Sequence, residues 1–161
     1  MTMLAFQDQI PYGLCFGYGA KPEPGFRIQS YWSGNDRAIC TFQPSDYQSL
    51  TSRRYLNSGL IAALIDYHCL CSAIAMAYQQ AERQIGEGEP IRFCTDRLSI
   101  EYLHPVPVDQ PVELLALFES IHDNKILLSC ILSSGQVTCA EGEVEAVRVP
   151  DGWPGKSPDS G

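Results

Sequence analysis

Residues 60 to 78 read LIAALIDYHCLCSAIAMAY and form the most apolar stretch of the chain. No proline occurs between residue 59 and about residue 84, and Asn57 and Ser58 supply N-cap side chains just before this stretch. Apolar residues occupy nearly every side of a helix built from it, a pattern typical of a helix enclosed by other structure. Asp66 and His68 interrupt the run, which argues against a membrane span. The sequence therefore predicts one long, buried helix.

Runs rich in β-forming residues lie on both sides of this helix. Residues 26–32 alternate between apolar and polar side chains, as in a half-buried strand, and a turn at Gly34, Asn35 and Asp36 leads into a second run. Short turns separate the last three runs of the chain, so we expect these to be antiparallel neighbours. The strands are predicted at about residues 26–32, 37–42, 95–103, 111–121, 126–133 and 137–149.

This order of elements predicts an α+β fold, a curved antiparallel sheet rolled around the helix. With 161 residues the chain is long enough for one domain with its own core, which we assign to residues 1–149. Prolines and glycines among the aromatic residues of 11–25 predict an irregular N-terminal segment over residues 1–25. Residues 150–161 have little apolar content beyond Trp153, and we expect a disordered tail there.

Charge and cysteine content exclude several classes of protein. The 19 acidic and 11 basic residues give a net charge of −8, which provides no electrostatic footprint for nucleic acid. The N-terminus lacks the basic start and apolar run of a secretory signal, so we expect a cytoplasmic protein with no membrane partner. Seven cysteines contain no CxxC pair, and three histidines have no ligand spacing. We therefore predict buried thiols, no metal site and no cofactor.

Two local motifs add a resemblance to a known family. Residues 57–66 read NSGLIAALID, and residues 98–107 read LSIEYLHPVP. The first is similar to a family motif of His-Gly-Gly followed, after six residues, by an acid within the helix. The second resembles a strand that ends in a Tyr-Leu-x-Pro-x-Pro corner. Over about residues 12–149 the chain thus resembles the PaaI-like branch of the hotdog-fold thioesterases, which implies a hotdog fold and hydrolysis of acyl-CoA thioesters.

The chain departs from the family pattern at two places. Asn57 and Ser58 stand where the family has its histidine and first glycine, whereas Gly59 and Asp66 match the motif. Residues 15–19 read CFGYG and resemble a CFGCG stretch of relatives without its second cysteine. These departures concern the activity more than the fold.

Asp66 is the candidate catalytic carboxylate. Thioester hydrolysis needs donors for the developing oxyanion and a carboxylate that attacks the carbonyl carbon or deprotonates a water. The amides of Ser58 and Gly59 lie at the predicted helix N-terminus, where unpaired N–H groups favour negative charge. Asp66 is the only carboxylate between Asp46 and Glu82, in a helix where an unpaired charge is costly. The alternative interpretation is an acid satisfied by a structural hydrogen bond.

The spacing of these groups predicts that two chains share each site. Ser58 and Asp66 are eight residues apart, about 12 Å along one helix, which is too far for both to act on one carbonyl. Antiparallel helices across a two-fold axis would bring the N-terminus of one helix beside the acid of the other. The family is similarly dimeric, with sites at the subunit boundary. We expect a homodimer, or a homotetramer of two dimers, that binds an acyl-CoA or related thioester.

Other side chains have both a candidate role and a simpler one. In related thioesterases a threonine at the start of the strand after the helix is often near the reacting group, which makes Thr95 a site candidate, although β-propensity alone also explains it. Arg53 and Arg54 suit either CoA phosphates or plain solvation. His68 points about 200° away from Asp66 round the helix, so we expect a structural imidazole.

Two rival functions stand beside hydrolysis of acyl-CoA. A non-catalytic hotdog module would bind an acyl-thioester or other apolar ligand without turnover, and the absence of the His-Gly pair at Asn57 and Ser58 favours it. The second rival is an interaction protein, for which only the dimer matters and no thioester is bound or hydrolysed. Turnover on a panel of acyl-CoAs separates hydrolysis from both.

Overall fold

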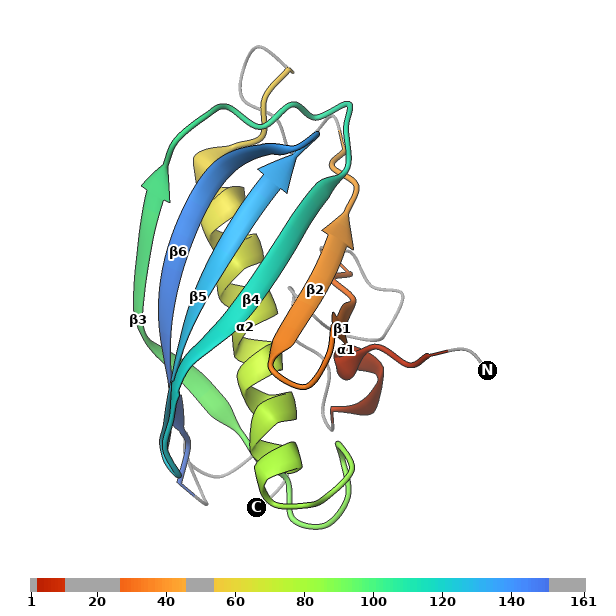
Figure 1. The fold of residues 1–161 in the computed structure, drawn as a ribbon, viewed down its shortest axis with the longest axis vertical. Coiled ribbons are helices and arrows are strands. Elements are labelled where there is room, and N and C mark those ends of the chain that lie inside the picture. Colours follow the sequence, from red (N-terminus) through yellow and green to blue (C-terminus); the bar gives the residue numbers. More distant parts are fainter. Residues whose placement is uncertain (1–2, 11–26, 46–53, 151–161) are drawn as a thin grey trace, which may run out of the picture.

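An antiparallel sheet and one long helix dominate the part of the chain that the computed structural model describes, residues 3–10, 27–45 and 54–150. The elements are α1 (Phe6–Gln9), β1 (Ser30–Trp32), β2 (Arg37–Phe42), α2 (Ser58–Gln80), β3 (Phe93–Tyr102), β4 (Val112–Ile121), β5 (Lys125–Ser134) and β6 (Val137–Arg148). The sheet has the strand order β1-β2-β4-β5-β6-β3 and curves around α2 (Figure 1). The predicted α+β architecture is confirmed.

Most strand boundaries agree with the sequence prediction. β2 begins and ends at the predicted residues, and β4, β5 and β6 differ by one residue or less at each end. β4 pairs with β5, and β5 with β6, as the short turns predicted. β1 is shorter than predicted: of the described residues 27–32 only 30–32 join the sheet, and Arg27 has a left-handed backbone with φ of 50° that does not fit a strand.

The N-terminal segment contains a short helix that the sequence did not predict. Residues 1–25 were expected to be irregular, yet α1 forms at Phe6–Gln9. The Asp8 carboxylate accepts a hydrogen bond from the Ala5 amide at 3.3 Å, and the Phe6 side chain is buried and contacts Trp32 edge to face. A local cap and one buried aromatic residue therefore stabilise this turn. The predictions for residues 11–25, Arg53 and the tail beyond Pro150 lie outside the described residues.

Helix α2 ends four residues earlier than predicted. Glu82 adopts a left-handed backbone with φ of 56°, and its amide bonds to the Gln79 carbonyl at 3.0 Å. The Arg83 amide bonds to the Tyr78 carbonyl, also at 3.0 Å. This pair of bonds is a Schellman motif, which closes a helix and usually has glycine in the left-handed position. Because a glutamate occupies that position here, the sequence carried no stop signal before Gly86.

The long helix is a core helix of this sheet. By length and composition α2 is apolar enough to cross a membrane, yet 67% of its apolar window is buried within the fold. Gly142 of β6 lets helix and sheet approach closely, since a Cβ atom there would lie 2.8 Å from Ile65 Cγ2 and 2.9 Å from Ile100 Cδ1. The contact fixes the level of the Ile65 turn of α2 against the sheet.

A bulge sets which side chains of β3 face the helix. Thr95 is opposite Ala146 of β6, whereas Arg97 is opposite Glu145, so one extra residue lies between them. Leu98 faces the same side as Thr95 because of this extra residue. In a continuous register Asp96 would take the place of Thr95 and turn toward the helix.

Candidate functional site

Helix α2 begins with Asn57 as its N-cap. The side-chain oxygen of Asn57 accepts a hydrogen bond from the Gly59 amide at 2.8 Å. Its carbonyl oxygen accepts from the amides of Leu60 and Ile61, both at 3.1 Å. These bonds are the usual way to satisfy the first amides of a helix. The Ser58 amide, by contrast, has no acceptor among the described residues.

Strand β3 holds the same end of the helix. The Tyr102 hydroxyl donates a hydrogen bond to the Ser58 carbonyl at 2.8 Å. Just before the helix, the Leu56 amide bonds to the Val106 carbonyl in the corner after β3, also at 2.8 Å. The two sequence motifs, residues 57–66 and 98–107, therefore lie against each other.

Asp66 and Thr95 form a second contact between helix and strand. The Thr95 hydroxyl donates a hydrogen bond of 2.6 Å to the Asp66 carboxylate, and both side chains are half-buried. Burial raises the pKa of the Asp66 carboxyl above its ordinary value, and the bond from Thr95 offsets part of this rise. A partly desolvated carboxylate is a stronger base than an exposed one, and the single hydroxyl fixes its orientation.

Asp66 lies on a face of α2 that the chain itself leaves open. Gly59, Ala62, Ala63 and Asp66 follow the three- and four-residue spacing of one helical face. Gly59 is exposed and the other three are half-buried, whereas the adjacent Ile65 is fully buried. The open face therefore presents both the helix N-terminus and the carboxylate, about 10 Å apart along the axis.

The strand beside this face is an edge of the sheet. In the part of the chain that the structure describes, β3 pairs with β6 alone (Figure 1). Leu98 and Tyr102 are 39% and 50% exposed, although their strand partners Val144 and Ala140 are completely buried. An unprotected edge with exposed apolar side chains is typical of a strand that another chain covers.

Comparison with known proteins gives structural neighbours. The sequence matches no family model, and no curated protein matches it. A thioesterase superfamily protein from Shewanella loihica PV-4 is 29% identical, with a TM-score of 0.61 over 86% of this chain and 96% of that one. The E. coli PaaI protein of the phenylacetic acid degradation operon is 12% identical, with a TM-score of 0.63 over 78% of this chain and 81% of that one. The chain has the hotdog fold of the thioesterase superfamily.

A hotdog neighbour with a bound ligand comes from Streptococcus mutans. Its structure was solved with acetyl-CoA, and it is 11% identical, with a TM-score of 0.62 over 76% of this chain and 88% of that one. At such low identity the likeness concerns the hotdog fold alone.

The hotdog scaffold brings the predicted site residues together in two groups. Asn57, Ser58 and Gly59 lie at the N-terminus of α2, and Asp66 lies two turns along with Thr95 beside it. The structure places the Thr95 hydroxyl beside the candidate carboxylate, and the role of Thr95 in the reaction stays a prediction. Arg54 is exposed on the segment that leads into α2. The contact of Tyr102 with Ser58 was not predicted from the sequence, although this tyrosine belongs to the second motif.

His68 is a structural residue of the hotdog core, as predicted. Its Nε2 lies 3.1 Å from the Ala38 carbonyl, which only accepts, so Nε2 carries the proton and Nδ1 accepts from the Ser30 hydroxyl at 2.7 Å. Ser30 in turn accepts from the Gln7 side chain at 2.9 Å. Complete burial lowers the pKa of His68 to about 4, so the ring is neutral. This chain of bonds ties α1 and the first two strands to α2.

The cysteines of the described hotdog residues are core thiols. Five of the six are buried, and Cys94 is half-buried. Burial raises the pKa of the Cys40 thiol to about 12, which suppresses the reactive thiolate. Within residues 3–10, 27–45 and 54–150, no three histidine, cysteine or acidic side chains gather as metal ligands.

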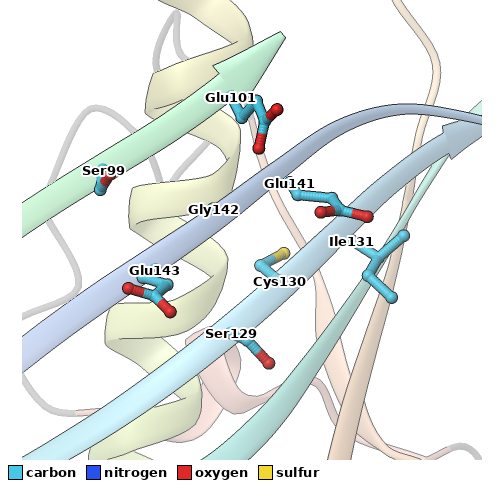
Figure 2. A pocket seen from close by; sticks show the side chains of 8 residues that line it. All are labelled: Ser99, Glu101, Ser129, Cys130, Ile131, Glu141, Gly142 and Glu143. Carbon is cyan, nitrogen blue, oxygen red and sulfur yellow. The ribbon is translucent and has the colours of Figure 1, made fainter. Parts of the chain in front are cut away.

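A cavity of about 440 Å³ lies on the side of the hotdog sheet that points away from α2 (Figure 2). Glu101 of β3 and Glu141 and Glu143 of β6 line it, and the helix lies behind these strands. Three carboxylates repel the phosphates of CoA. The open face of α2 is therefore the better candidate for an acyl-CoA site.

Proposed function

We propose that this hotdog protein hydrolyses acyl-CoA thioesters. The observation that carries the proposal is the pair of Asp66 and Thr95, a desolvated carboxylate held by one hydroxyl on the open face of a buried helix. In this role Asp66 either attacks the thioester carbon or deprotonates the attacking water. Neighbours solved with acetyl-CoA and with coenzyme A support the substrate class. So does the thioesterase superfamily protein at 29% identity.

The Ser58 amide is the proposed donor to the thioester oxygen. It lies at the N-terminus of α2, where the helix dipole favours negative charge, and no described residue accepts its hydrogen. The Gly59 amide was expected to act beside it, but in this structure Gly59 donates to Asn57. The proposed oxyanion site therefore has one available amide.

Two chains complete each proposed site. Ser58 and Asp66 belong to one continuous helix, so about 12 Å of helix separates them. A donor from one chain and an acid from the other meet only if two α2 helices lie antiparallel across a two-fold axis. The open helix face and the exposed edge of β3 support this arrangement.

The hydrogen bonds between helix and strand locate the proposed two-fold axis. Asp66 bonds to Thr95, and Ser58 bonds through its carbonyl to Tyr102. These two bonds mark two levels along helix and strand, one at Asp66 and one at the helix N-terminus. A two-fold axis that brings the partner's helix N-terminus to Asp66 must pass midway between these two levels. Asp96 is the extra residue of the bulge and adds no level along the sheet, so on β3 the midpoint falls at Ser99, where β3 would pair with its own copy.

Release of free thiol from a panel of short, long and aromatic acyl-CoAs tests the proposal. Turnover by wild type that is lost in Asp66→Asn supports it. A folded dimer that turns over none of the panel would overturn it.

The second candidate is a non-catalytic module that binds an acyl-thioester. The bond from Gly59 to Asn57 favours this candidate, because it removes an oxyanion donor. Saturable binding of an acyl-CoA without thiol release distinguishes the module from the enzyme.

A further inference from the structure

One peptide group at the helix N-terminus is held at both of its polar atoms. The peptide between Ser58 and Gly59 has its carbonyl oxygen bonded to the Tyr102 hydroxyl at 2.8 Å. Its N–H is bonded to the Asn57 side chain, also at 2.8 Å. The first bond fixes the direction of the peptide plane, and the second occupies its only donor.

The occupied amide is well placed to serve the reaction. Gly59 and Asp66 are seven residues apart, which puts them on the same face of α2. Gly59 is exposed, and it has no side chain to shield its own N–H. Among the described residues, and apart from the backbone of the helix, a Cβ atom added at Gly59 would meet only the Asn57 side-chain oxygen, at 3.1 Å.

We propose that Asn57 is a positioning residue that withholds the Gly59 amide from the thioester oxygen and so slows turnover. The inference rests on the proposed acyl-CoA hydrolysis. An oxyanion held by Ser58 alone receives one backbone donor, and release of the cap supplies a second donor in the same turn. The Tyr102 hydroxyl keeps the peptide plane in place when the cap is removed, so the freed N–H retains its direction.

Asn57→Ala tests the inference because alanine has no side-chain acceptor. We expect kcat to rise about 10-fold, less than the roughly 100- to 1,000-fold effect of a single oxyanion donor because Ser58 already supplies one, with a smaller change in KM. The melting temperature falls, since alanine is a poor N-cap. Asn57→Ser is the matched variant: serine retains a side-chain acceptor for the Gly59 amide, so the gain in kcat expected for Asn57→Ala is lost.

Two further variants distinguish the effect of the freed Gly59 amide on kcat from the effect of a generally loosened helix. Gln80→Gly weakens the far end of α2, where Gln80 is exposed, and lowers stability without a gain in kcat. Tyr102→Phe in the Asn57→Ala background removes the hydroxyl that fixes the peptide plane. The gain from Asn57→Ala then disappears.

A readout without turnover uses an acyl-CoA analogue in which a methylene group separates carbonyl and sulfur. In amide NMR spectra of wild type the analogue shifts Ser58 and leaves Gly59 unchanged, and in Asn57→Ala it shifts both. Equal Gly59 shifts in the two proteins, with unchanged kcat, overturn the inference and leave the hydrolysis proposal intact. Absence of both binding and turnover in every variant overturns the proposed function, and this inference with it.

Discussion

The hydroxyl of Thr95 donates a 2.6 Å hydrogen bond to the carboxylate of Asp66, which joins the edge strand of the sheet to the central helix at the candidate site. Two opposing effects act on this carboxyl: burial raises its pKa, and the bond lowers it by a smaller amount. The pair thus combines a basic carboxylate with a fixed orientation. Both properties are open to direct measurement.

Asp66→Asn is expected to lower kcat by at least about 100-fold, the usual scale for a positioned base or nucleophile. The asparagine oxygen still accepts from Thr95, and the substitution removes a charge that burial disfavours. The melting temperature should therefore equal or exceed that of wild type, and dimerisation and ligand binding should persist. Thiol-release kinetics and thermal melts on the same samples check this. Full activity with reduced stability would mark Asp66 as a structural acid.

Thr95→Val should move the acidic limb of the pH–kcat/KM profile to higher pH. Activity requires ionised Asp66, so it is lost as the pH falls through the pKa of this carboxyl. Valine removes the one hydrogen bond that lowers this pKa, and burial then raises it without opposition. Thr95→Ser keeps the hydroxyl and serves as the matched control. If the acidic limb lies at the same pH in wild type, Thr95→Val and Thr95→Ser, the hydrogen bond from Thr95 does not lower the pKa of Asp66.

Ser99→Cys is expected to form a disulfide between two copies of the chain under mild oxidation. Ser99 is exposed and lies at the proposed crossing of β3, the edge strand, with its partner. Glu101→Cys is the control, because antiparallel pairing moves two copies of this position far apart along the strand. Non-reducing gels measure the product, and sedimentation measures the assembly. A stable monomer at micromolar concentration contradicts the two-chain site.

His68→Gln should remove a pH dependence of stability that wild type shows between about pH 6.5 and pH 4. The ring is neutral in the fold, where its pKa is about 4, and it protonates near 6.5 in the unfolded chain. The unfolded state binds more protons in this window, so stability is complete above it and falls as the pH is lowered. The loss attributable to this histidine is on the order of 3 kcal/mol.

Urea unfolding at several pH values measures this effect as the difference between wild type and His68→Gln. Both proteins have the same carboxyl groups, so the contribution of these groups to the pH dependence of stability cancels in the difference. Parallel curves for the two proteins across the window would show that His68 is not the titrating group.

The sequence predicted elements well where local signals were strong. The apolar run in α2 and the alternation in β2, β4, β5 and β6 reflect burial along each element, which residue order reveals directly. The prediction was wrong where an uncommon residue took a special backbone. Glu82 closes α2 in a left-handed conformation, and Arg27 has a left-handed backbone three residues before β1 begins.

The site was predictable only in part, because its contacts join distant segments. Asp66 and the N-cap were found from the helix itself, and Thr95 from the resemblance to a family. The bond from Tyr102 to Ser58 spans 44 residues and depends on the level at which β3 crosses the helix. The use of the Gly59 amide by Asn57 depends on one side-chain rotamer, which sequence does not specify.

The bulge in β3 affects how this chain should be aligned with other sequences. Asp96 is an extra residue relative to β6, so the distance from Thr95 to Tyr102 counted along the chain exceeds the distance counted along the sheet by one position. A relative with a regular strand would have one residue fewer there and still direct its threonine to the helix. An alignment without gaps would match that threonine to Asp96 and report a missing site residue. Correct alignment needs a gap at position 96.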